Sequence, residues 1–210
     1  MVTDIDITAP VSAAGKKRKN SQDRIFRSAV SVLARKGYHN TRITDIARHA
    51  GVAYGLVYHY FGSKQDILEV ILDEVGIRFF ERLERIAAID EPVYEKLAKV
   101  ADFMFDSYLA SEDMIHVLVN EVVHGPSNDR ATEIAAGIVN RIGQMVQTSQ
   151  LQAEVEPQVV ALSFFGGVQM LLTSLVAGYY ESADEKRSIV VKRLKGQIRL
   201  LLQGGFFGRL

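Results

Sequence analysis

Apolar residues recur along most of the chain at the three- and four-residue spacing of amphipathic helices, whereas alternating strand patterns are hard to find. The pattern predicts a first helix that begins at Asn20 or Ser21 and ends before Gly37. It also predicts one long helix from Ser63 to about Ala88. Only four prolines interrupt the 210 residues. We therefore expect an all-α protein of about nine helices.

Two short apolar stripes lie between these helices, and Gly51 separates them. Glycine adopts positive φ without strain, so Gly51 can end the first of two short helices. Two short helices joined around a glycine are typical of a helix-turn-helix. The second helix, roughly residues 54–60, would turn a polar face outwards, and such a helix fits the DNA major groove. The stripes are Ile43, Ile46, Ala47 and Ala50, then Leu56, Val57, Tyr60 and Phe61.

The segment around this glycine resembles the DNA-binding segment of TetR-type transcriptional repressors. The resemblance covers residues 21 to about 70 and implies a three-helix DNA-binding domain at residues 20–65. It also implies a larger helical effector-binding and dimerisation domain at residues 66–210. Two residues depart from the family pattern, because Ala53 replaces a usual serine and Leu56 replaces a common threonine. The matching runs are Thr44-Asp45-Ile46-Ala47, Ala50-Gly51-Val52, Gly55, Tyr58-His59-Tyr60-Phe61 and Ser63-Lys64.

Several residues of this segment are predicted to contact DNA. Thr44 stands at the start of a helix, where it can act as the N-cap and turn that end towards a phosphate. Lys64 lies at the positive end of the long helix, where an anion is already favoured. Tyr58 could instead pack against the first helix. We assign backbone positioning to Arg42, Thr44, Tyr58 and Lys64 and, guided by the resemblance, base reading to Tyr54, Gly55 and His59.

Charge is distributed unevenly although the formal net charge is zero. Residues 1–65 hold 11 Lys and Arg against 4 Asp and Glu, a balance of +7, and residues 66–210 hold 14 against 21, a balance of −7. A basic amino-terminal part suggests a polyanionic partner for that part alone. Residues 1–19 lack helical periodicity and are expected to be a disordered basic arm. The cluster Lys16-Lys17-Arg18-Lys19 either contacts DNA or is a solvated tail.

The helices predicted for the body combine large apolar side chains with a few polar positions. At helical spacing such side chains first of all build a core. Buried polar groups need partners, however, and a small-molecule pocket is one way to supply them. The resemblance implies an effector, and an apolar pocket with few polar anchors suits a lipophilic one, such as a fatty acyl thioester or an aromatic compound. The candidate effector-binding residues are Phe103, Tyr108, His116, Asn120, His124, Phe165 and Gln169.

Residues 158–180 form a stretch of 23 residues without a charge. This length would span a bilayer, but several polar residues dilute its apolar character. A helix buried between two subunits is also apolar nearly all round. The final helix, from Asp184 to about Leu202, is amphipathic. Two such helices from each of two chains would form a four-helix bundle, the homodimer contact that the resemblance implies, so we expect no membrane partner.

Signatures of catalysis and metal binding are largely missing. The sequence has no cysteine, which excludes disulfides and thiolate metal sites and fits a cytoplasmic protein. It contains no GxSxG, GxxxxGKS/T, GxGxxG or HExxH motif. The pairs Glu112/His116 and Glu121/His124 could each share a helix face, but such a pair lacks ligands from a facing helix. We expect no cofactor, no metal and no enzymatic activity.

The favoured interpretation is a ligand-responsive repressor that binds a palindromic double-stranded DNA operator as a homodimer and is released by a small-molecule effector. One alternative is an all-α enzyme or ligand carrier whose basic head is incidental. Another is a membrane-anchored regulator that uses residues 158–180 as its anchor. The sequence leaves open the operator, the effector and the choice between repression and activation.

Overall fold

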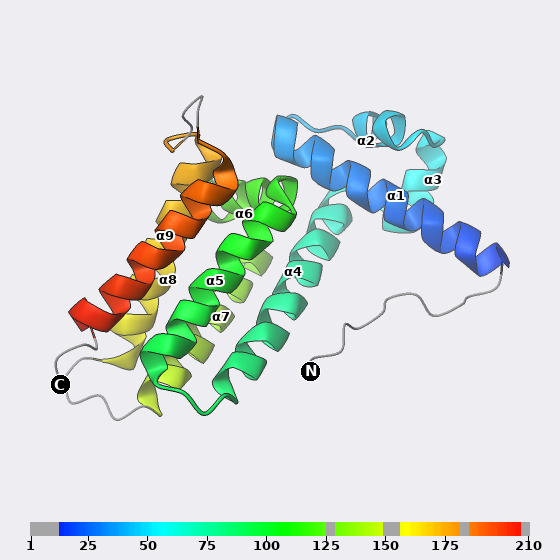
Figure 1. Cartoon of the computed structure of the whole chain (residues 1–210). Coiled ribbons are helices and arrows are strands. Elements are labelled where there is room, and N and C mark those ends of the chain that lie inside the picture. Colours follow the sequence, from blue (N-terminus) through cyan, green and yellow to red (C-terminus); the bar gives the residue numbers. More distant parts are fainter. Residues whose placement is uncertain (1–12, 125–128, 149–155, 181–184, 207–210) are drawn as a thin grey trace. The chain divides into compact units, whose positions relative to one another are not determined.

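A computed structural model describes residues 13–124, 129–148, 156–180 and 185–206. Within these ranges every regular element is a helix (Figure 1), which confirms the all-α prediction. The chain divides into two compact units, Met1–Leu68 and Glu69–Leu210. We call them the amino-terminal and carboxy-terminal units and describe each by itself.

The amino-terminal unit contains three helices and the start of a fourth: α1 (Ala13–Lys36), α2 (Ile43–Ala50), α3 (Tyr54–Phe61) and α4 (Lys64–Ala87). Helix α2 packs against both α1 and α3. Each helix buries one apolar face in a shared core, as their amphipathic patterns predict. The buried side chains include Ile25, Ala29, Leu33, Ile46, Val57, Phe61, Ile67 and Leu68.

Helix α1 begins earlier than the apolar pattern predicts. It starts at Ala13, so the predicted start at Asn20 or Ser21 is wrong, and residues 13–19 are helical instead of disordered. The apolar pattern misses residues 13–19 because it detects only helices that bury one face. Ala, Lys and Arg favour the helical conformation intrinsically, whether or not a face is buried. The rest of the predicted basic arm, residues 1–12, lies outside the described residues.

Two glycines end the short helices, and the sequence predicts this role for the first of them, Gly51. Gly51 has a φ of 61°, and the Val52 amide donates to the carbonyl of Ala47 at 3.0 Å. Gly62 has a φ of 60°, and its amide donates to the carbonyl of Tyr58 at 3.0 Å. Both positions lie in the left-handed half of φ space, where a side chain is strained. These bonds satisfy carbonyls at the two helix ends and redirect the chain sharply.

The carboxy-terminal unit is built around α5 (Val93–Ala110). This helix contacts each of the helices that follow it in the chain. They are α6 (Glu112–His124), α7 (Asp129–Gln147), α8 (Pro157–Val176) and α9 (Arg187–Leu201), and α9 continues into a π-helical turn, η1 (Leu202–Phe206). All the residues of the apolar face predicted for α5 are buried, namely Val93, Leu97, Val100, Met104 and Tyr108.

Helix α4 is fastened to α7 by close packing and by ion pairs. At Gly76 a Cβ atom would lie 3.1 Å from Cδ1 of Ile134, so glycine lets the two helices approach closely. The Arg130 guanidinium lies 2.6 Å from the Asp73 carboxylate. Arg141 lies 3.2 Å from the Glu84 carboxylate and 4.2 Å from the centre of the Phe80 ring. The contacts recur along α4 and define one face that it turns to α7.

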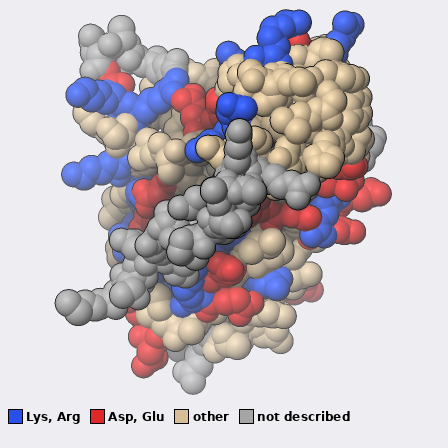
Figure 2. All heavy atoms as spheres, turned by 90° about the vertical axis from the view of Figure 1, so that its right-hand side faces the viewer, with Lys and Arg blue, Asp and Glu red and all other residues tan. Residues whose placement is uncertain are grey.

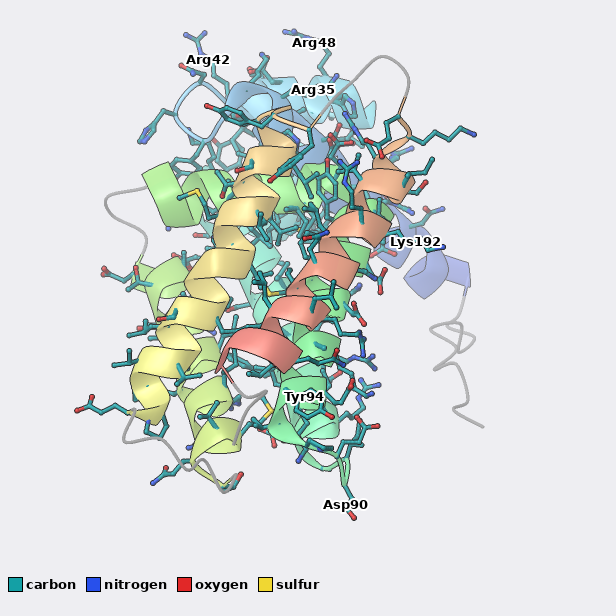
Figure 3. The ribbon with its side chains drawn as sticks, turned by 60° about the vertical axis from the view of Figure 1, so that its left-hand side comes forward. Arg35, Arg42, Arg48, Asp90, Tyr94 and Lys192 are labelled. Carbon is teal, nitrogen blue, oxygen red and sulfur yellow. The ribbon has the colours of Figure 1, made fainter. Side chains whose placement is uncertain are left out.

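Helix α8 is shorter than the uncharged stretch predicts, because it ends at Val176 and not at Tyr180. Gly178 has a φ of 76° and turns the chain away. Among the described residues, α8 is a helix long and apolar enough to cross a membrane, and 28% of its most apolar window is buried. In Figure 3, α8 and α9 lie in front of the other helices of their unit. Their exposed apolar side chains include Val159, Leu162, Met170, Ile189, Leu200 and Leu201.

Candidate nucleic-acid interface and effector domain

Helix α3 exposes two tyrosines that contact each other. The Tyr54 hydroxyl donates to the Tyr58 hydroxyl at 3.0 Å, and the ring centres lie 4.9 Å apart in an edge-to-face arrangement. Tyr54 is 49% exposed and Tyr58 is 42% exposed. The hydrogen bond to Tyr58 raises the pKa of Tyr54 above its ordinary value. The residues lie four apart, so one helix face presents both hydroxyls to solvent.

The other predicted base-reading residues lie on the same exposed side. Gly55 is exposed, and a Cβ atom there would meet nothing within 4 Å. His59 is exposed, and its ring contacts that of Tyr60. The opposite side buries Val57 and Phe61, while Tyr60 is half-buried. Tyr54, Gly55, Tyr58 and His59 therefore form one accessible surface, which we call the α3 face.

Helix α2 is capped differently from the prediction. Its N-cap is Arg42, so Thr44 is the second residue of the helix and not its cap. The Asp45 carboxylate supplies the cap, because Oδ2 accepts the Arg42 amide at 3.1 Å. A hydrogen bond from Lys36, helped by the Arg42 amide, lowers the pKa of Asp45. Thr44 stays exposed near this end, where its hydroxyl is accessible to a phosphate.

Basic side chains extend outwards around this cap. Figure 3 shows Arg42 and Arg48 directed away from the helices into solvent. Arg48 lies 3.8 Å from the Asp45 carboxylate but remains largely exposed. On the face of the molecule in Figure 2, Lys and Arg side chains are interspersed with Asp and Glu. That face therefore carries no continuous basic field.

Lys64 holds a loop of its own unit together. Its ammonium group donates to the carbonyls of Tyr38 at 2.6 Å and Thr41 at 3.0 Å, and it lies 4.1 Å from the centre of the Tyr38 ring. The Tyr38 hydroxyl in turn donates to Gln65 at 2.8 Å. Ser63 caps α4 by accepting the Asp66 amide. Lys64 thus joins the start of α4 to the loop between α1 and α2, although the sequence predicts that it faces a phosphate.

Replacing Lys64 with methionine should lower the free energy of unfolding by about 1–3 kcal/mol, because two charge-assisted hydrogen bonds are lost. Chemical denaturation measures this effect. Arg42→Met is the matched control: it should leave stability unchanged and lower the slope of log affinity for DNA against log salt by about 1. A Lys64→Met protein of unchanged stability and reduced salt slope would instead assign Lys64 to a phosphate.

The predicted effector-binding residues lie on three helices of the carboxy-terminal unit. Tyr108 is buried on α5, and Phe103 is half-buried with its ring centre 5.2 Å from that of Phe79. Phe165 and Gln169 are half-buried on α8. The side chains of Asn120 and His124 lie outside the described part of the structure. Contacts between α5 and α6, and of both with α8, bring the three helices together.

His116 lies on α6 in a small charged group. Its Nε2 atom is 3.4 Å from the Glu112 carboxylate and has no hydrogen-bond partner. Glu112 also pairs with Arg187 of α9. Among the described residues, no group of three His, Cys, Asp or Glu side chains is placed to hold a metal ion. The Glu112–His116 pair, considered above as a metal pair, instead belongs to an ionic contact between α6 and α9.

A hollow of about 220 Å³ lies elsewhere, between α4 and α7. Leu83, Ala87 and Met145 supply apolar walls, and the polar lining comes from Glu84, Arg141, Gln144 and Thr148. None of the predicted effector-binding residues lines it. Of the predicted effector-binding residues, Tyr108 is buried, whereas Phe103, Phe165 and Gln169 are half-buried.

Comparison with known proteins identifies the family. A family model for bacterial regulatory proteins of the tetR family matches residues 25–71. Over 202 residues the chain is 28% identical to the fatty acid metabolism regulator protein of Bacillus subtilis (strain 168), covering 92% of this chain and 100% of that protein. Residues 25–71 therefore form a DNA-binding segment of the tetR family, and the resemblance to a regulator extends along nearly the whole chain.

Solved structures of TetR-family regulators share the whole fold. FadR from Bacillus subtilis in complex with stearoyl-CoA aligns with a TM-score of 0.73 at 25% identity, covering 87% of this chain and 98% of that one. A TetR-family regulator from Bordetella parapertussis 12822 aligns with a TM-score of 0.70 at 22% identity, covering 91% and 98%, a likeness of fold. The chain is therefore a DNA-binding transcriptional regulator, and α2 and α3 form its helix-turn-helix.

Two residues that organise this TetR-family helix-turn-helix were not predicted to do so. Asp45 is part of the matching motif, but its capping of α2 was missed. The available signal was an acidic residue three positions after the true cap, as in a capping box. Tyr38 was missed altogether, because its bonds to Lys64 and Gln65 join residues 26 and 27 positions apart. Its only local signal was an aromatic residue in a short polar loop.

Proposed function

We propose that this TetR-family regulator is a repressor that binds a palindromic operator as a homodimer and is released by a long-chain fatty acyl-CoA. The observation that carries the choice of ligand is the likeness to FadR in complex with stearoyl-CoA, which spans 87% of this chain. The relative with a name in fatty acid metabolism matches along its entire length. Both likenesses extend through the carboxy-terminal unit, where an effector would bind.

In this proposal the helix-turn-helix makes the contacts with the operator. The α3 face enters the major groove, and Arg42, Thr44 and Tyr58 contact the phosphates on either side. A twofold dimer presents two such helices, so the half-sites are separated by about one helical turn or a multiple of it. A repressor of this kind occupies its own upstream region until the ligand arrives.

Exposed apolar side chains on α8 support the dimer. Val159, Leu162 and Met170 lie at spacings that place them, with Gly166, on one stripe of the helix. Gly166 is exposed, and a Cβ atom there would meet nothing within 4 Å, so a second helix can approach its backbone closely. A contiguous apolar stripe of this length on a soluble regulator suits an interface between subunits. Ile189 and Leu200 of α9 are exposed apolar side chains as well.

Release requires that the ligand bind one state of the dimer more tightly than the DNA-competent state. In this proposal an acyl chain binds among α5, α6 and α8 and shifts these helices relative to one another. The two DNA-binding units then lose the spacing that the operator demands. A ligand with equal affinity for both states would release nothing, however tightly it bound.

Long-chain acyl-CoA should release the protein from its own upstream DNA in a mobility-shift assay. Burying each further methylene contributes about 0.8 kcal/mol, so lengthening the chain by one carbon should strengthen binding about fourfold until the pocket is full. Free coenzyme A and aromatic acids serve as comparison ligands. Equal responses to acyl-CoA and free coenzyme A would contradict an acyl-binding pocket. Release by aromatic acids alone would show that the effector is an aromatic compound and not an acyl-CoA.

A pair of glutamine variants tests where acyl-CoA binds. Gln169 is half-buried on α8 among the predicted effector-binding residues, whereas Gln144 is exposed on α7 beside the separate hollow. Gln169→Ala should raise the acyl-CoA concentration needed for release, while Gln144→Ala should leave it unchanged. The opposite result would move the ligand site to the hollow between α4 and α7.

A further inference from the structure

The α3 face carries aromatic rings at the end of the helix that meets bases. The recognition helix of a helix-turn-helix contacts base edges with its amino-terminal residues, which here are Tyr54 and Gly55. His59 lies in the last turn of α3, away from that end. The helix contains no Arg, Lys, Asn or Gln, the residues that pair with guanine and adenine through two hydrogen bonds. The amino-terminal end of α3 therefore presents mainly aromatic carbon to a base pair.

The Tyr54 ring is supported by a second aromatic ring. Its centre lies 4.9 Å from that of Tyr58 in an edge-to-face arrangement, and the two hydroxyl oxygens are 3.0 Å apart. Both side chains are exposed, and their contact at the rings and at the hydroxyls restricts them on the helix surface. Side chains that are restricted beforehand lose less conformational entropy when they bind. Whichever hydroxyl donates, the pair presents a preformed aromatic surface.

Gly55 lets this surface approach the floor of a groove. A Cβ atom at Gly55 would meet nothing within 4 Å, so the space beside Tyr54 is open. Glycine also has no side chain that would hold the backbone away from a base pair. In the major groove thymine presents its C5 methyl, an apolar group that packs against apolar side chains. An aromatic surface that can approach the base pairs closely is therefore suited to that methyl.

We propose that Tyr54 recognises the C5 methyl of one thymine in each half-site through its ring carbons, with Tyr58 as the positioning residue. This rests on the proposed function, because it requires α3 to enter the major groove. A methyl group that is removed from water against the ring strengthens binding about fourfold. The contributions of two separated half-sites multiply, so both methyls together strengthen binding about 15-fold.

Replacing thymine by 2′-deoxyuridine tests this contact, because it removes the methyl and leaves the hydrogen-bonding atoms of the base unchanged. The segment of its own upstream DNA that the full-length protein protects is mapped first. Each thymine of the two half-sites is then replaced in turn, at the equivalent position of both half-sites together. At one position, wild-type protein should bind the thymine duplex about 15-fold more tightly than the uracil duplex.

Variants of the two tyrosines assign this ratio to the aromatic pair. Tyr54→Phe keeps the ring and should keep the full ratio, whereas Tyr54→Ala should bind the two duplexes within about twofold of each other. Tyr58→Ala removes the supporting ring and should lower the ratio to about fourfold, and Tyr58→Phe should retain it in full. Tyr179→Ala is the matched control, because it removes an exposed tyrosine of the carboxy-terminal unit and should leave the ratio unchanged.

Three results would overturn the inference. Equal affinity of the wild-type protein for thymine and uracil at every position would show that no methyl is read. A full ratio in Tyr54→Ala would assign the effect to the shape of the DNA or to another residue. A full ratio in Tyr58→Ala would remove the positioning role of Tyr58. Circular dichroism of each variant checks that the helices are intact. Failure of the proposed function is distinguishable, because the wild-type protein would then protect no segment of its upstream DNA.

Discussion

Replacing Leu162 with lysine should convert the regulator into monomers and weaken operator binding by at least about 100-fold. Leu162 is 59% exposed on α8, at the centre of the stripe formed with Val159, Gly166 and Met170. In the proposed dimer it is buried against the partner. A lysine there would place an unpaired charge in an apolar interface, where desolvation costs several kcal/mol. A monomer reaches one half-site at a time and loses the gain of binding two together.

Sedimentation and mobility-shift assays measure the two parts of this prediction. Ile77→Lys is the matched control, because Ile77 is an aliphatic side chain of nearly the same exposure, 57%, on α4. It adds the same charge away from α8 and should remain dimeric. A dimeric Leu162→Lys protein with normal operator affinity would show that the stripe on α8 is not the interface. A Leu162→Lys protein that is monomeric but binds the operator with normal affinity would show that operator binding does not require the dimer.

Replacing Phe105 with alanine should lower the free energy of unfolding by about 3–5 kcal/mol. Phe105 is fully buried on α5, the helix that contacts all later helices of its unit. Its removal leaves a cavity that the surrounding helices fill only in part, so both the buried area and the contacts are lost. Chemical denaturation at one fixed protein concentration measures the effect, because the stability of a dimer depends on concentration.

The neighbouring Phe103 provides the comparison. It is half-buried on the same helix, with its ring against Phe79 and near Arg82. Phe103→Ala should cost distinctly less stability than Phe105→Ala and, as a predicted effector-binding residue, should alter the acyl-CoA concentration needed for release. Equal losses of stability with an unchanged acyl-CoA response would make both residues parts of the core and remove Phe103 from the ligand site.

Much of the fold follows from local pattern. The apolar faces of α2, α5 and α7 are buried at the positions that their spacing predicts, because a helix brings residues three and four apart onto one side. Gly51 ends α2 because the chain there needs a positive φ. The helix-turn-helix is recognisable for the same reason, since its stripes, turn and exposed α3 face all lie within one short segment.

The pattern of apolar residues fails to predict a helix boundary where intrinsic helix preference or a reversal of the chain decides it. Helix α1 extends back to Ala13 without an amphipathic pattern, and α8 ends at Val176 although the apolar run continues. A run that is apolar nearly all round also gives no sign of which face meets the protein. The stripe of Leu162 was therefore visible only once α5, α6 and α7 had covered the rest of α8.

The sequence by itself determined an all-α chain with a helix-turn-helix and an uncharged carboxy-terminal helix, because these depend on periodicity and on residues close together. Only the tertiary structure showed that Lys64 binds the carbonyls of Tyr38 and Thr41. It also placed Tyr108 within the core. Such contacts join residues far apart in the chain, and a long side chain at one position can reach several partners. Which partner it takes is decided by the packing of the helices, and the order of the residues does not reveal it.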